Sequence, residues 1–542
     1  MKKHWLLFLI FFLALALRLY KLGSLPFNPH EDEILSGYVG RFILENGVDL
    51  YGNKWPLLYF NKFGDYYIIL PMYLAGLSSF LFGVNAFAIR FPAAFIGSLI
   101  VFPLYYLTLQ VFKDKKAALI AALLGAITPW HLVLSRSSVE GIIGSTIFLG
   151  AIVCVLEYIR NKRNLVGLLS VGLFFLSYWI YHPFRIYTPL VLLPLPILFA
   201  SIRKDRRMLM TWVVTAGLFF LLTFGISSTE WGSGRFEQTS IFSDLSGVTI
   251  RIQEQIYNSG NDNIFIARLF HNKVIGFGRE FIAQYLTYFS PVFLFLKGGA
   301  ESRFDVPDNG LYFITYLIGV ISACFLGKYK GDKPYLWYFL YLLVIAPIPA
   351  ALTYYGSPNI HRAAFFGVLL LIPIAYGFAQ LLKLKYVRLI TVGLVLLVLV
   401  EFGYFWHQYS VQADVYTGIR RNDAFKELAL YTAQHKDEYD LVYLPAEGNT
   451  ALYYLYFTQD FNPKYASQFK TDARIDKVGN VQFLDATCPT EKLWANDFDK
   501  KILVVNRHSC GEKADLQKVT DIKGRNPLLG FTLYTTSPAE QK

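Results

Sequence analysis

Long apolar segments constrain this chain more than any other feature of its sequence. Crossing the hydrocarbon core of a bilayer takes about 20 predominantly apolar residues in a helix, and eleven segments meet that requirement. They lie near residues 4–20, 88–112, 117–134, 141–159, 165–181, 187–202, 208–226, 310–327, 335–352, 363–382 and 388–405. Of the 542 residues, 54% are hydrophobic and only 17% charged, which excludes an ordinary soluble enzyme. The sequence therefore predicts a mainly α, polytopic membrane protein of about eleven transmembrane helices.

Basic segments follow every second span, and such segments face the cytoplasm. They are Lys2-Lys3 and the stretches 113–116, 160–163, 203–207, 328–333 and 383–388. The short connections between them carry one Arg or Lys each, namely Arg136, Arg185 and Arg362. We therefore predict a multi-pass protein of the cytoplasmic membrane with a cytoplasmic N-terminus and an extracytoplasmic segment 406–542. Ala14-Leu15-Ala16 after an apolar run also permits a cleaved signal peptide; we prefer an uncleaved anchor.

Two long external loops, about 21–87 and 227–309, contrast with the short connections elsewhere. Each contains an apolar stretch, 66–83 and 274–296, that would place the following basic loops outside if it were a full span. We interpret both stretches as re-entrant or interfacial helices. Long structured loops tend to carry function, so we expect the chemistry on the external face of a membrane domain that spans residues 1–405.

The segment 406–542 is polar, and its charges are roughly balanced, so the net charge of +12 comes mainly from the cytoplasmic loops and does not indicate nucleic-acid binding. Short strands are predicted near 440–444, 481–484 and 501–505, with helices near 420–435 and 448–458. These patterns predict an external α/β domain. Cys488 and Cys510 both lie in it; a disulfide between them is compatible with that location, but the spacing does not prove one.

Acidic residues gather just beyond the first apolar segment, in His30-Glu31-Asp32-Glu33. One interpretation is a helix cap, because negative charge suits a helix N-terminus. The other is catalysis, since carboxylates beside a membrane can have raised pKa values and act as general bases. Asp65, immediately before the apolar stretch of the same loop, is a weaker candidate. The two interpretations of the acidic cluster are compatible.

Candidate anion-binding residues occur at the external ends of the spans. For each of them alone, snorkelling of a long side chain or placement at the membrane interface is the simpler explanation. Their convergence on one face makes a phosphate site reasonable for the group. The candidates are Arg90, His131, Arg136, Arg185, His361 and Arg362.

Cofactor motifs give little guidance. The histidines are scattered, and neither His-x-x-x-His nor Cys-x-x-Cys occurs, so we predict no metal ligands. Binding of a divalent cation by carboxylates is the alternative. A phosphate-cradling glycine loop followed by Lys-Ser or Lys-Thr is also missing, which argues against an ATP-driven enzyme. The energy for any reaction would then come with the substrate.

Over about residues 5–405 the chain resembles the membrane glycosyltransferases of the C superfamily, specifically the group that contains protein O-mannosyltransferases and the aminoarabinose transferases of lipid A. The motifs are fairly specific together and weak singly. They are Arg18-Leu-Tyr20, Asp32-Glu33, Gly64-Asp-Tyr-Tyr67, the run from Leu81 to Pro92, and Thr128-Pro-Trp-His131 to Ser135-Arg136.

The resemblance implies a polyprenyl-phosphate-linked sugar as donor, with its isoprenoid tail in the bilayer and its phosphate at the outer surface. It assigns Asp32 as the base that activates an acceptor hydroxyl, with inversion at the anomeric carbon. Glu33 and Asp65 would position the base or the acceptor, and the external arginines would stabilise the leaving phosphate. The extra carboxylate of Glu31 leaves some ambiguity about which residue is the base. The acceptor stays open: protein, lipid or glycan.

Two rival functions remain. A transporter or flippase is also polytopic, but such proteins tend to place ionisable residues near the bilayer midplane, whereas here they gather at one face. An oligosaccharide ligase or polymerase would use a longer lipid-linked donor, and the sequence does not separate it from a monosaccharide transferase.

Overall fold

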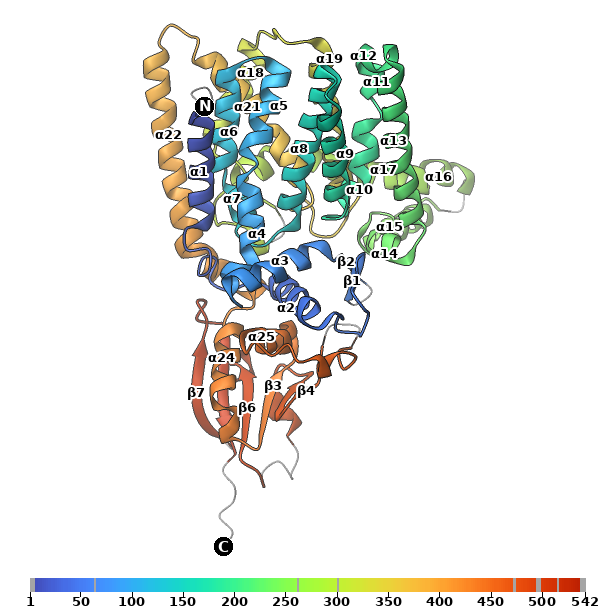
Figure 1. Ribbon diagram of the computed structural model, residues 1–542. Helices are drawn as coiled ribbons and strands as arrows, with labels where there is room; N and C mark the ends of the chain where they lie inside the picture. Colours follow the sequence, from blue (N-terminus) through green and yellow to red (C-terminus); the bar gives the residue numbers. More distant parts are fainter. Residues whose placement is uncertain are drawn as a thin grey trace. The chain divides into compact units, whose positions relative to one another are not determined.

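The computed structural model describes residues 5–62, 65–260, 263–299, 302–470, 474–493, 499–513 and 516–536. The chain forms two compact units (Figure 1). The first, here the helical unit, comprises Met1–Tyr20, Ala93–Ser135 and Val139–Trp406. The second, here the loop-tail unit, comprises Lys21–Pro92, Arg136–Ser138 and His407–Lys542. The first long loop lies in the same unit as residues 407–542, here called the tail, because the two share one hydrophobic core, described below. The domain boundary at residue 405 stays a prediction.

Helices account for all eleven predicted spans. Six of these spans are long and apolar enough to cross a membrane within the described residues: Ala86–Phe112 (α4 and α5), Glu140–Asn161 (α8), Arg206–Ser227 (α13), Lys333–Ala351 (α19 and α20), Ala364–Leu381 (α21) and Val387–Tyr416 (α22 and α23). A seventh is the bent pair α6 (Lys115–Ile127) and α7 (Pro129–Ser135). The other four are helices of 10–17 residues: α1 (Trp5–Leu19), α9 (Asn164–Tyr178), α10 with α11 (Pro183–Leu198) and α18 (Thr315–Leu326). The structure therefore supports a multi-pass bundle with fewer full-length spans than the eleven predicted.

The bend of 52° between α6 and α7 follows from the sequence Thr128-Pro129. Proline has no N–H, so the carbonyl of Gly125 loses its usual helical donor, and the residue before proline is pushed out of the helical conformation. Thr128 accordingly has φ −62° and ψ 130°. The guanidinium of Arg18 in α1 donates instead to the carbonyls of Gly125 and Ala126, at 3.0 Å each. A cation thus satisfies buried carbonyls at the C-terminal end of α6.

The second long loop is helical. It comprises α14 (Glu230–Thr239), α15 (Val248–Asn258), α16 (Ile264–Phe270), α17 (Lys273–Thr287) and a π-helical turn at Val292–Lys297. The apolar stretch predicted over 274–296 therefore divides into α17 and this turn. The stretch predicted over 66–83 is likewise divided, into a strand and the helix α3 (Leu70–Phe82).

The loop-tail unit has one continuous hydrophobic core. Helix α2 (Glu31–Asn46) contributes Leu35, Tyr38 and Phe42, each fully buried. They pack in one cluster with buried residues of α24 (Phe425–His435), α25 (Thr450–Phe457) and the sheet of the tail. Tyr38 stacks on Phe461 with ring centroids 5.1 Å apart. Because burial of one large apolar side chain contributes about 1.5–3 kcal/mol, α2 and the tail stabilise each other substantially.

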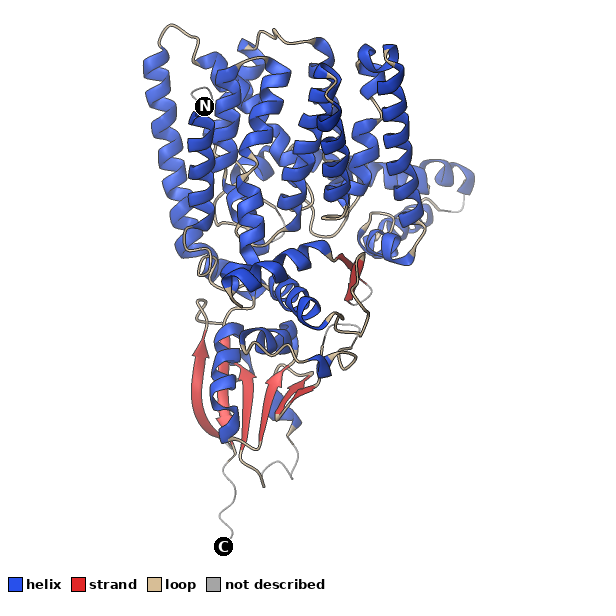
Figure 2. Ribbon diagram, viewed as in Figure 1, coloured by secondary structure: helices blue, strands red, loops and turns tan. Residues whose placement is uncertain are grey.

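The tail contains a six-stranded mixed sheet of order β4-β5-β3-β6-β8-β7 (Figure 2). Strands β5 and β6 run parallel to β3, and the remaining pairs are antiparallel. The strands are β3 (Leu441–Pro445), β4 (Lys477–Val478), β5 (Val481–Leu484), β6 (Ile502–Arg507), β7 (Gln517–Lys523) and β8 (Gly530–Thr535). Three of them coincide with the strands expected from the sequence.

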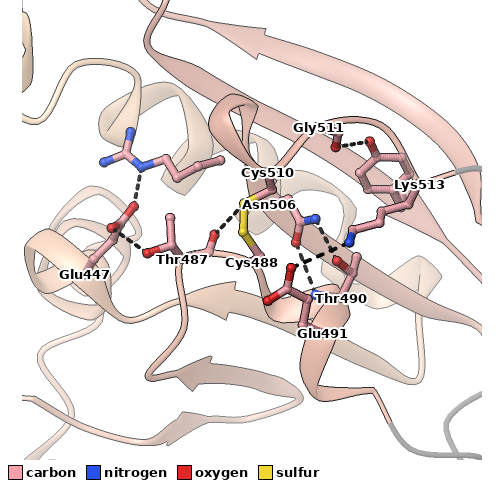
Figure 3. The surroundings of a disulfide bond; sticks show 11 residues. Glu447, Thr487, Cys488, Thr490, Glu491, Asn506, Cys510, Gly511 and Lys513 are labelled. Atoms are coloured by element: carbon pink, nitrogen blue, oxygen red, sulfur yellow. Dashed lines mark hydrogen bonds and ion pairs between the residues drawn. A yellow bond between two sulfur atoms is a disulfide. The ribbon is translucent and has the colours of Figure 1, made fainter.

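Cys488 and Cys510 form a disulfide (Figure 3). It joins the segment after β5 to the short turn after β6, and the sulfur of Cys510 also lies 3.3 Å from the carbonyl of Thr487. Asn506 in β6 contacts the same segment through the backbone N–H and hydroxyl of Thr490. The bond suits the predicted extracytoplasmic location, where disulfides persist.

Helices α2 and α3 cross at Gly40 and Gly76 with their backbones in contact. A Cβ built on Gly40 would lie 1.8 Å from the carbonyl oxygen of Met72, and backbone cannot give way as a side chain can. We expect Gly40→Ala to separate the helices and to lower the free energy of unfolding by about 1–3 kcal/mol, measured by thermal unfolding in detergent. Gly393→Ala in α22 is the control, because its Cβ would meet nothing within 4 Å. An equal loss in both variants would contradict this account.

Candidate active site

The acidic cluster forms the first turn of α2, so all three carboxylates lie where the helix dipole favours negative charge. Glu31 is paired with Lys62 and also accepts a hydrogen bond of 2.6 Å from Asn449 Nδ2. Lys62 ends β1 (Tyr59–Lys62), the first strand of a hairpin. Glu31 is therefore engaged by a cation from the hairpin and an amide from the tail.

Glu33 is fully buried and has a structural role. Its carboxylate accepts the backbone N–H of His30 at 3.1 Å, which caps the helix. Arg90, also fully buried, donates to it at 3.1–3.3 Å. Burial by itself would raise the pKa of Glu33, but the charges of Arg90, His30 and Arg421, with the Arg90 hydrogen bond, hold this pKa below its usual range. A carboxylate held ionised by buried cations is a poor proton acceptor.

Asp32 lies between these two residues, and its side chain is 33% exposed. Its Oδ1 accepts a hydrogen bond of 3.2 Å from the hydroxyl of Tyr67, and its Oδ2 lies 3.9 Å from Nδ1 of His30. Asp32 thus combines access to solvent with a hydrogen bond that orients it. Of the three carboxylates in this turn, Asp32 is the one whose surroundings best suit a general base.

Asp65 begins β2 (Asp65–Ile68), which pairs antiparallel with β1. Residues two apart in a strand point to the same face, so Asp65 shares a face with Tyr67, the residue that contacts Asp32. Its register partner is Lys62. The hairpin therefore carries Asp65 on the same element that contacts both Glu31 and Asp32.

Arg90 and Arg136 are buried completely and hold loops in place. Arg90 donates to the carbonyls of Leu22 and Pro26 at 3.0 and 2.8 Å, besides Glu33. Arg136 donates to the carbonyl of Leu25 at 2.9 Å and to the hydroxyl of Tyr409 at 3.2 Å. In this structure both arginines bind the protein's own backbone.

A cavity of about 370 Å³ in the helical unit contains the strongest candidate anion site. Arg185, in α10, lines it, and its side chain is only 6% exposed. Among the residues that the structure describes, none offers a hydrogen-bond partner to its three guanidinium nitrogens. Aromatic rings flank the guanidinium, with centroids 5.3 Å away at Trp231, 5.4 Å at Trp179 and 5.7 Å at Tyr178. A buried cation without hydrogen bonds is costly unless an anion completes it.

Two further arginines, Arg235 and Arg362, line the same cavity. Arg362 donates to the hydroxyl of Thr353 at 2.9 Å and to the carbonyl of Tyr355 at 2.6 Å, which fixes its direction. Its neighbour His361 stacks on Tyr181 with ring centroids 4.9 Å apart, and its Nε2 lies 3.6 Å from Glu140. Three cations around one cavity are well suited to a phosphate group.

His131 has no exposed surface and lies beside Arg18, with Nδ1 2.8 Å from the guanidinium and 3.2 Å from the hydroxyl of Ser135. These contacts belong to the bend between α6 and α7. The structure therefore places His131 within the packing of that bend, and its contribution to substrate binding stays a hypothesis.

Several site residues were not predicted. Tyr67 belongs to the motif Gly64-Asp-Tyr-Tyr67, but the sequence gives it no role toward Asp32, and it assigns no role to Arg235 or Arg421. No local pattern marks these residues, because each acts through a partner distant in the chain. Within the described residues, no three His, Cys, Asp or Glu side chains come together in an arrangement that could hold a metal ion.

Part of the chain matches a known protein family. Residues 69–228 match the family described as dolichyl-phosphate-mannose-protein mannosyltransferase. The search of curated proteins found no match.

Solved structures resemble the chain at low sequence identity. The archaeal oligosaccharyltransferase AglB from Archaeoglobus fulgidus, solved with an inhibitory peptide and a dolichol-phosphate, is 14% identical with a TM-score of 0.50. The match covers 86% of this chain but only 65% of AglB, so the chain spans just under two thirds of that protein. ArnT from Cupriavidus metallidurans, bound to undecaprenyl phosphate, is 12% identical with a TM-score of 0.49, and the match covers 98% of this chain and 97% of ArnT. At such identities the AglB comparison shows a shared fold.

Proposed function

We propose that this chain is a membrane glycosyltransferase of the C superfamily and that it moves a sugar from a polyprenyl-phosphate-linked donor to an acceptor hydroxyl on the external face of the membrane. The cavity around Arg185 supports the proposal most directly. It offers a buried cation that makes no hydrogen bond to any described residue, in a cavity that Arg235 and Arg362 also line, within a bundle of apolar helices. A lipid phosphate matches both features, because its head group is anionic and its tail belongs in the bilayer.

Asp32 is the proposed base. The acceptor oxygen forms a bond to the anomeric carbon while the bond from that carbon to the phosphate oxygen breaks, and the acceptor proton passes to the Asp32 carboxylate. Attack from the side opposite the phosphate inverts the anomeric centre. A positioned base contributes about 10²–10⁴-fold to such a step. Arg185, Arg235 and Arg362 would stabilise the charge that develops on the departing polyprenyl phosphate.

A monosaccharide donor fits the volume of the cavity, which is partly open. About 370 Å³ is at the small end of the range for ligand sites, which suits one sugar phosphate. The dolichol-phosphate in the AglB structure agrees with a lipid-phosphate donor class for this fold. Transfer of a whole oligosaccharide remains the second candidate function because AglB is an oligosaccharyltransferase.

The test is release of free polyprenyl phosphate by the purified protein in nanodiscs, with a panel of polyprenyl-phosphate monosaccharides and a membrane extract as the source of acceptor. We expect release from one donor of the panel, dependent on the extract. Release only from a lipid-linked oligosaccharide would favour the second candidate. Release from no donor by a folded protein would contradict the proposal.

A further inference from the structure

Residues 27–33, which comprise the acidic turn Glu31-Asp32-Glu33 and the segment before it, contact the tail at five positions. Every contact joins the first long loop to residues more than 380 positions later in the chain. The contacts are Phe27 N to Asp414 Oδ1 at 2.9 Å, Asn28 Nδ2 to Asp423 Oδ1 at 3.2 Å, the Tyr453 hydroxyl to the Pro29 carbonyl at 2.7 Å, Asn449 Nδ2 to Glu31 Oε1 at 2.6 Å, and Arg421 Nη2 to Glu33 Oε2 at 3.7 Å.

Arg421 makes the most extensive of these connections. Its side chain is 4% exposed, and Nε donates to the carbonyl of Asn28 at 3.2 Å while Nη2 faces Glu33. One guanidinium therefore ties the main chain before the acidic turn to a carboxylate within it. Arg90 holds the other side of Glu33 and, through the carbonyls of Leu22 and Pro26, the preceding loop.

Asp32 precedes Glu33 directly in this turn, so fixing Glu33 also fixes the backbone that carries Asp32. Loss of one partner from a buried ion pair leaves the other charge uncompensated and is strongly unfavourable. Without Arg421, the Glu33 carboxylate would keep Arg90 but lose its second cation, and the carbonyl of Asn28 would lose its donor. The turn would then reach more conformations, few of which place Asp32 correctly.

We infer that the tail is a structural part of the catalytic unit and that Arg421 is a positioning residue, which holds the acidic turn in the geometry that Asp32 needs as a base. This inference rests on the proposed function. It assigns a role to the 407–542 segment that requires no acceptor binding by the tail. Arg421 itself acts through Glu33 and Asn28.

The test compares Arg421→Gln with Arg420→Gln, the same substitution at the neighbouring, exposed arginine. Two quantities are measured: backbone hydrogen exchange of a peptide covering residues 27–33, and kcat and KM for the donor. In Arg421→Gln we expect faster exchange and a kcat lowered about 10- to 100-fold, because small displacements of a catalytic group have effects of this size. KM for the donor should stay unchanged, since the proposed phosphate site uses other residues. Arg420→Gln should match the wild type.

Unchanged exchange in a folded Arg421→Gln protein would overturn the inference, as would faster exchange with unchanged kcat. A wild-type protein that releases no polyprenyl phosphate would instead overturn the proposed function, while the exchange comparison still reports whether Arg421 orders the turn. If Arg421→Gln does not fold, Tyr453→Phe removes the hydroxyl that donates to the Pro29 carbonyl and that also interacts with Asn422. It should speed exchange and lower kcat about 2- to 10-fold, the range of one hydrogen bond; wild-type values for both would overturn the inference.

Discussion

Asp32→Asn should reduce release of polyprenyl phosphate by about 10²- to 10⁴-fold, because an amide cannot take the acceptor proton and general-base catalysis contributes this amount. Asn preserves the size of the side chain and can still accept the hydrogen bond from Tyr67. The turn should therefore keep its structure. The measurement is initial-rate release of polyprenyl phosphate from the donor identified in the panel, with thermal unfolding as the check on folding.

Glu31→Gln is the matched control for Asp32→Asn. Glu31 is in the same helical turn and has a similar side-chain exposure of 31%, but its partners are Lys62 and Asn449. We expect a loss of about tenfold or less, from the weakened contact with the hairpin. If Glu31→Gln abolished release and Asp32→Asn did not, Glu31 would be the base.

Arg185→Gln should lower kcat/KM for the donor by about 10²-fold or more, since loss of one preorganised donor to a developing oxyanion has an effect of that order. It should also weaken binding of free polyprenyl phosphate. Tryptophan fluorescence can follow this binding, because Trp179 and Trp231 lie against the guanidinium. The substitution introduces a neutral amide where the structure has a buried charge without hydrogen bonds, so we expect the protein to remain folded.

Arg279→Gln is the control for Arg185→Gln. Arg279 is an exposed arginine of α17, within the second long loop. Removing it lowers the net charge by the same amount without touching the cavity, and we expect wild-type kinetics. Equal losses in the two variants would indicate a general effect of charge on donor recruitment and would contradict a specific phosphate site at Arg185.

Much of the helical unit could be predicted from the sequence because apolar length is a strong, local signal. All eleven predicted segments coincide with helices, and the resemblance to the C superfamily is confirmed by the family match over residues 69–228. The number of full-length spans was not predictable in the same way. Hydropathy averages over a break such as Pro129, so a bent pair and helices of 10–17 residues produce the same signal as a straight span.

The acidic turn, Glu31-Asp32-Glu33, could also be predicted from the sequence, but the separate roles of its three carboxylates could not. Glu33 and Asp32 are neighbouring carboxylates, but their surroundings differ. Arg90, 57 residues away, donates to Glu33, and Tyr67, 35 residues away, donates to Asp32. The arginines posed the same problem. All lie near predicted span ends, yet Arg90 and Arg136 are bound to backbone carbonyls. Arg185 instead lines a cavity, and its guanidinium makes no hydrogen bond within the described part of the chain. These distinctions depend on long-range contacts that no local pattern encodes.

The shared core of α2 and the tail also has a consequence for biosynthesis. Residues 21–92 leave the ribosome long before residue 407, and at roughly 5–20 residues per second the interval is about 15 to 60 s. During that time Leu35, Tyr38 and Phe42 lack the tail residues that bury them in the finished protein. The nascent chain must therefore pass through a stage in which the membrane helices are inserted while α2 still presents an uncovered apolar face. Activity would appear only after translation is complete.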